Sequence, residues 1–68
     1  MNFNLQESSR KFLKENLPSA LEAYTLREAL ILLDDLINEK GFAPPHYDEY
    51  NDFGEEAQRV YDDLYYNN

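Results

Sequence analysis

The sequence predicts a single small all-α domain, residues 1–68, with three helices at about residues 5–17, 25–40 and 52–66. Three observations predict it. Apolar residues recur at helical spacing in each range, helix-capping patterns precede the ranges, and prolines interrupt the chain between them. A core of this size contributes roughly 3–5 kcal/mol of stability, so single contacts matter.

The first helix is expected to begin after Asn4, because Asn4 as N-cap and Glu7 three residues later have the spacing of a capping box. Its apolar face holds four residues: Leu5, Phe12, Leu13 and Leu17. Pro18 either ends this helix or opens a short helical turn of its own, since proline suits the first position of a helix.

The second helix has the clearest signals at its two ends. Thr25 and Glu28 form a capping box, and Tyr24 is placed to pack against the first turn as a hydrophobic staple. Gly41 follows the last turn, where a glycine with positive φ often ends a helix. The predicted core face consists of Leu26, Ala29, Leu30, Leu33, Leu36 and Ile37.

The segment 41–51 is predicted to be a loop, because Pro44 and Pro45 favour extended backbone and lack amide donors. The third helix then begins at Asp52, three residues before Glu55. Its apolar positions follow at helical spacing: Phe53, Ala57, Val60, Tyr61 and Leu64. We therefore expect the first and third helices to pack around the second.

Charge is distributed unevenly along the chain. Residues 1–33 carry four acids and four bases, whereas residues 34–68 carry ten acids and two bases and so hold the whole net charge of −8. The same half contains five of the six tyrosines. An acidic, tyrosine-rich half favours binding to a basic partner, since acids attract basic surfaces and tyrosines supply contact area.

Composition argues against several classes of function. The chain has no cysteine and one histidine, which speaks against disulfides, thiol chemistry and a zinc site. It has no apolar run long enough to span a membrane, its first residues predict no signal peptide, and its acidity disfavours direct nucleic-acid binding. We therefore expect a cytoplasmic protein that is not an enzyme and uses no cofactor or metal.

The predicted partner-binding residues are acids for steering and tyrosines for contact. They are Asp34, Asp35, Glu55, Glu56, Asp62 and Asp63 among the acids, and Tyr50, Tyr65 and Tyr66 among the tyrosines. The partner is expected to be a basic protein, for example a nucleic-acid-binding protein that is inhibited when its site is occupied. The simpler interpretation is a solvated charged face that keeps a small protein soluble.

Two alternatives remain open from the sequence. Ile31 lies on the polar side of the second helix, and Leu32 lies at the edge of the core face. The favoured interpretation is that the proline loop folds over Ile31, and the alternative is an exposed contact with a partner or a weak homodimer through Ile31 and Leu32. The opposed charges of the two halves, including bases at Arg10, Lys11 and Lys14, would also allow self-association.

The second alternative is a peptide ligand for a WW-type domain. The loop contains Pro44-Pro45-His46-Tyr47, which fits the Pro-Pro-x-Tyr pattern that such domains bind. The same residues are equally compatible with a loop that simply separates two helices.

Overall fold

The computed structural model describes residues 3–44 and 49–68 and confirms the all-α prediction. Within these residues the chain forms four helices and no strand, with one isolated antiparallel bridge between Phe42 and Tyr50. The helices are α1 (Glu7–Asn16), α2 (Pro18–Leu21), α3 (Leu26–Lys40) and α4 (Asp52–Tyr66). Pro18 opens the short α2, as one of the two sequence interpretations predicted.

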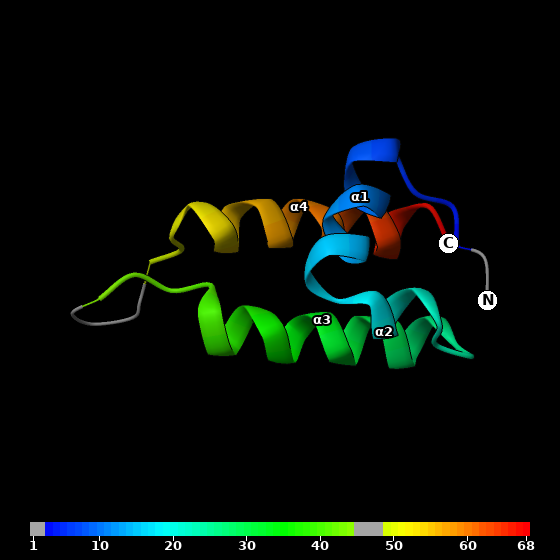
Figure 1. Cartoon of the computed structure of the whole chain (residues 1–68), viewed down its shortest axis with the longest axis horizontal. Coiled ribbons are helices and arrows are strands. Elements are labelled where there is room, and N and C mark those ends of the chain that lie inside the picture. The colour runs from blue at the N-terminus through cyan, green and yellow to red at the C-terminus, as the bar shows by residue number, and fades with distance from the viewer. Residues whose placement is uncertain (1–2, 45–48) are drawn as a thin grey trace.

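The two long helices, α3 and α4, run antiparallel along the molecule, and α1 and α2 pack across one end of this pair (Figure 1). α1 packs on α4 and on α2, and α2 packs on α3, so the short helices lie across the α3–α4 pair. The prediction that the first and third helices pack around the second therefore holds for α4 but is wrong for α1, because α2 lies between α1 and α3. The core lies between these elements, and its most deeply buried large side chains are Leu13, Leu33 and Leu64. α1 is therefore held directly beside the polar face of α4.

The start of α1 differs from the sequence prediction. The helix begins at Glu7 with Gln6 as its N-cap, and the Gln6 side chain makes no capping hydrogen bond. Asn4 instead pairs with the end of the chain: its backbone N–H donates to Asn68 Oδ1 at 2.8 Å, and Asn68 Nδ2 donates to its carbonyl oxygen at 2.9 Å. Asn4 is not the N-cap because these contacts, with a residue 64 positions away in sequence, hold it in a segment that precedes the helix.

At the start of α3 the predicted capping box is present, but the predicted hydrophobic staple is not. Thr25 is the N-cap, and its Oγ1 accepts from the backbone N–H of Glu28 at 3.1 Å. Glu28 Oε2 in turn accepts from the backbone N–H of Tyr24 at 3.3 Å. The Tyr24 ring is 88% exposed, so the predicted hydrophobic staple is wrong.

The junction between α3 and α4 depends on close backbone contact. Gly41 caps α3 with φ −91°, so the predicted positive φ is wrong. The glycine is needed instead for space, because a Cβ on Gly41 would lie 3.1 Å from the Gly54 Cα atom. Asn51 joins the two helix ends: its Oδ1 accepts from Gly54 N–H at 2.7 Å as the N-cap of α4, and its Nδ2 donates to the Lys40 carbonyl at 2.8 Å.

Candidate partner-binding surface

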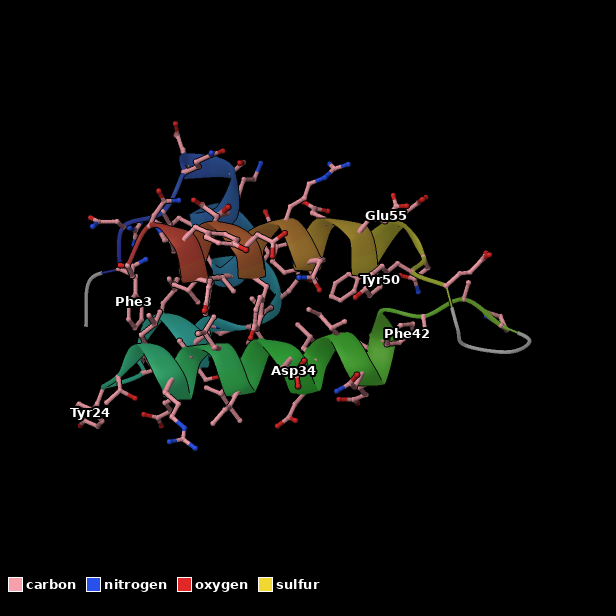
Figure 2. All side chains as sticks on the ribbon, turned by 180° about the vertical axis from the view of Figure 1, so that it is seen from behind. Phe3, Tyr24, Asp34, Phe42, Tyr50 and Glu55 are labelled. Atoms are coloured by element: carbon pink, nitrogen blue, oxygen red, sulfur yellow. The ribbon has the colours of Figure 1, made fainter. Side chains whose placement is uncertain are left out.

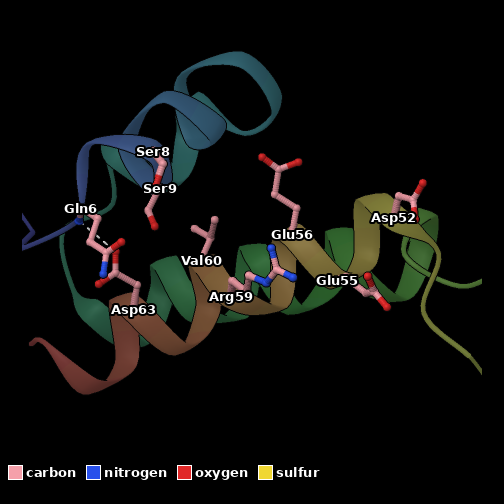
Figure 3. Close-up of a pocket in the computed structure, with 9 residues that line it drawn as sticks. All are labelled: Gln6, Ser8, Ser9, Asp52, Glu55, Glu56, Arg59, Val60 and Asp63. Carbon is pink, nitrogen blue, oxygen red and sulfur yellow. Dashed lines mark hydrogen bonds between the residues drawn. The ribbon is translucent and has the colours of Figure 1, made fainter.

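An open groove of about 580 Å³ runs between the first turn of α1 and the outer face of α4 (Figure 3). We call it the acidic groove. It is lined by Gln6, Ser8, Ser9, Asp52, Glu55, Glu56, Arg59, Val60 and Asp63. Of its four acids, Asp52, Glu55 and Glu56 are exposed to solvent, and Arg59 is the one base among these lining residues.

Helical spacing gathers these charges on α4. Asp52, Glu56 and Arg59 follow one another at intervals of four and three residues, which places them on one side of a helix. Core contacts fix the opposite wall, because the Phe12 ring of α1 packs against the Phe53 ring of α4 with centroids 5.3 Å apart. The groove therefore has rigid helical walls on both sides.

Asp63 departs from the prediction that it belongs to the exposed acidic face. Its side chain is only 9% exposed, and Asp63 Oδ2 accepts from the backbone N–H of Gln6 at 2.9 Å. Asp63 Oδ1 accepts from Asn67 Nδ2 at 2.6 Å, and Ser9 provides a further hydrogen bond. Asp63 thus caps the N-terminus of α1 from another helix and is not free to contact a partner.

These contacts also determine the charge state of Asp63. Burial raises the pKa of its carboxyl, but hydrogen bonds from the Gln6 backbone and from the Ser9 and Asn67 side chains favour the charged form more strongly. The net result is a pKa below the ordinary value. The carboxylate also lies at the positive end of the α1 dipole, which favours the same form.

The other predicted residues do not share one surface. Asp34 lies on α3 at a second groove, Asp35 is exposed on α3 and lines neither groove, and Asp62 is exposed on α4, where it accepts from Gln58 Nε2 at 3.1 Å. Figure 2 shows Asp34 and Glu55 on different helices, pointing away from each other. Of the predicted acids, Glu55, Glu56 and Asp63 therefore line the acidic groove, whereas the others are scattered outside it and form no continuous face with them.

The three predicted tyrosines lie at opposite ends of α4. Tyr50 stacks on Phe42 beside the α3–α4 junction, with ring centroids 5.1 Å apart, and its hydroxyl donates to Gln58 Oε1 at 3.2 Å (Figure 2). Tyr65 and Tyr66 lie in the last turn of α4 and meet edge to face at 5.1 Å. All three rings are exposed, but Tyr50 lies at one end of α4 and the Tyr65–Tyr66 pair at the other.

The second groove lies between α3 and α4, has a volume of about 370 Å³ and is mainly apolar; we call it the apolar groove. It is lined by Leu26, Arg27, Leu30, Ile31, Asp34 and Tyr61. Ile31 is 51% exposed, so the favoured interpretation that the proline loop covers it is wrong. Leu32 is half-buried and is not part of this groove.

Sequence reasoning missed the roles of Leu26, Leu30 and Tyr61, which it assigned to the core alone. They do pack against the core, but each is only partly buried. The sequence did contain a sign of this groove, namely the position of Ile31 outside the main apolar arc of the helix. An apolar side chain outside that arc makes the apolar surface wider than the core can bury, so part of it stays exposed.

The basic residues of α1 are partly engaged within the chain. Arg10 Nη2 donates to the Phe3 carbonyl at 2.7 Å and so holds the N-terminal segment against α1. Lys11 and Lys14 are exposed. The Pro-Pro-x-Tyr pattern lies mostly outside the described residues, which omit 45–48, so it stays a prediction.

Residues 3–44 and 49–68 contain no group of three or more acids and histidines placed to hold a metal ion. Across those same ranges, the helices are too short or too polar to cross a membrane. The chain matches no protein family, no curated protein and no solved structure.

Proposed function

We propose that this protein is a cytoplasmic binding protein that holds a basic segment of a partner protein in the acidic groove. The observation that carries the proposal is the arrangement of Asp52, Glu55 and Glu56, three exposed carboxylates along one open groove with Arg59 as the one base among its lining residues. Lysine and arginine side chains complement such a groove in charge and in hydrogen bonding.

Fold stability accounts for only part of this concentration of acid, because Asp52 and Glu55 lie in the first turn of α4, where the helix dipole favours acids. Asp63 has a structural role, since it caps α1. Glu55, Glu56 and Asp62 have no comparable buried contact, and the last turn of α4 contains no base to offset the helix dipole near Asp62. A chain with net charge −8 also repels itself, and a basic partner would offset this repulsion.

Inhibition follows as a consequence of this proposal when the partner's basic segment is its nucleic-acid-binding site, because an acidic protein that occupies such a site excludes nucleic acid from it. This step rests on charge complementarity alone. Tyr66 lies beyond the groove at the end of α4 and would extend the contact area, whereas Tyr65 stacks on Tyr61 on the side of the apolar groove.

The proposal predicts that the double variant Glu55→Lys/Glu56→Lys binds the partner at least about tenfold more weakly than the wild type. The partner would be captured from cell extract on the immobilised wild-type protein, and its affinity for each purified variant measured by calorimetry at about 0.15 M salt. Both residues are exposed, so the variant should remain folded.

The matched control is Glu22→Lys/Glu39→Lys, which makes the same change in net charge at exposed positions outside the acidic groove. It should weaken binding much less. Equal losses in the two double variants would mean that only net charge matters, and unchanged affinity for Glu55→Lys/Glu56→Lys would refute the site.

A further inference from the structure

The apolar groove carries an ordered pattern of charge. On α3, Arg27 and Asp34 line the groove on either side of Leu30 and Ile31. The two charged residues are seven positions apart, which corresponds to about two helical turns, or about 10.5 Å along the axis. Ile31 is 51% exposed between them, so an apolar centre is bordered by one positive and one negative end.

This pattern is complementary to itself under a two-fold rotation. When a second α3 lies antiparallel across the first, with the axis passing between Leu30 and Ile31, each Arg27 faces the Asp34 of the other copy. The Leu30 and Ile31 side chains of the two copies then meet at the centre and lose contact with water. A parallel arrangement would instead place like charges opposite each other, which is destabilising.

We propose that the apolar groove is the interface for a second copy of this chain, in an antiparallel α3–α3 dimer closed by two reciprocal Arg27–Asp34 pairs. Tyr61, which stacks on Tyr65 with centroids 6.5 Å apart, forms the outer wall on α4. The interface is small and both chains carry charge −8, so the dimer is weak and depends on concentration.

This interface is independent of the proposed function. The acidic groove and the apolar groove share no lining residue, so a dimer leaves the acids of α4 open to a partner. The two proposals can therefore fail separately. The variants below leave the acidic groove unchanged, and the Glu55→Lys/Glu56→Lys pair leaves the apolar groove unchanged.

The test is a charge exchange followed by sedimentation equilibrium at about 0.15 M salt. The Arg27→Asp variant brings two carboxylates together at each contact, and the Asp34→Arg variant brings two guanidinium groups together. Each single variant should therefore associate at least about tenfold more weakly than wild type. An equimolar mixture of the two variants relieves the clash at both contacts of a heterodimer. At one contact the two substituted side chains face each other with opposite charge, and at the other the native Asp34 of one variant faces the native Arg27 of the other. The mixture should form heterodimers, and the double variant Arg27→Asp/Asp34→Arg should regain self-association.

The matched control is Asp35→Arg, which makes the same charge change as Asp34→Arg on the neighbouring exposed residue outside the groove. Both changes reduce the net negative charge and hence the general repulsion, so a loss of association in Asp34→Arg alone must arise from the local contact. Circular dichroism establishes that each variant is folded. A wild type that remains monomeric at the highest soluble concentration overturns the proposal, as does a mixture that forms no heterodimer.

Discussion

Replacing Gly54 with alanine is expected to destabilise the domain by about 2–3 kcal/mol, although alanine is the better helix former. A Cβ at position 54 would overlap the carbonyl oxygen of Gly41 and lie 2.7 Å from its carbonyl carbon. These are backbone atoms, so the new methyl group cannot be accommodated by a side-chain rotation. The start of α4 must then move away from the end of α3, which also disturbs the Asn51 contacts with both helices.

Urea denaturation followed by circular dichroism measures this effect. In an ordinary exposed helix, replacing glycine with alanine raises the free energy of unfolding by up to about 1 kcal/mol. A fall in the free energy of unfolding would therefore show that close packing at position 54 outweighs helix propensity. The control is Glu55→Ala, an exposed neighbour in the same turn, which should change the free energy of unfolding by no more than about 0.5 kcal/mol. A Gly54→Ala variant as stable as wild type would show that the two helix ends are not in close contact.

The substitution Asp63→Asn is expected to lower the free energy of unfolding at neutral pH by about 2 kcal/mol. Both carboxylate oxygens accept hydrogen bonds, one from the Gln6 backbone and one from Asn67. An asparagine replaces one of these acceptor oxygens with an amide NH₂ group, which then faces an N–H donor of Gln6 or Asn67. It also removes the negative charge near the N-terminus of α1. The whole first helix is then less firmly held to α4.

The pH dependence of this difference follows from the lowered pKa of Asp63. A carboxyl whose pKa is lower in the folded state stabilises the fold above its unfolded pKa of about 3.9, and this contribution is lost as the pH falls through the folded value. The stability gap between wild type and Asp63→Asn should therefore be present at about pH 7 and about pH 5, and shrink by about pH 2.

Urea midpoints for wild type, Asp63→Asn and Asp62→Asn at these pH values provide the measurement. Asp62 is the matched control, because it is an exposed aspartate one residue away on the same helix. Its variant should differ from wild type by no more than about 0.5 kcal/mol at about pH 7. A gap between wild type and Asp63→Asn that stays constant down to about pH 2 would mean that the charge of Asp63 does not stabilise the fold.

The helices themselves could be predicted from the sequence because their signals are local. Thr25 and its partner Glu28 are three residues apart, and apolar spacing marks both long helices. The start of α1 could not be predicted in the same way. It depends on Asp63, which bonds to Gln6 from 57 residues away, so a pattern read within one helical turn contains no information about it.

The candidate site was only partly predictable for a similar reason. Helical spacing correctly placed Glu55 and Glu56 on the exposed side of α4. It could not distinguish Asp62 from Asp63, since both lie outside the apolar arc and only the position of α1 makes one of them buried. The predicted helix over 52–66 already places Tyr50 before its first turn and Tyr65 in its last turn. What the sequence could not predict is the stacking of Tyr50 on Phe42, because that contact depends on how α3 and α4 meet.

The most direct test of the binding proposal is an amide chemical-shift map of the ¹⁵N-labelled protein during titration with the captured basic partner. The largest shifts are expected at both walls of the acidic groove, at Ser8 and Ser9 on α1 and at Glu55, Glu56 and Arg59 on α4. Shifts restricted to the outer face of α3, around Asp35 and Glu39, with the acidic groove unchanged, would contradict the proposed site.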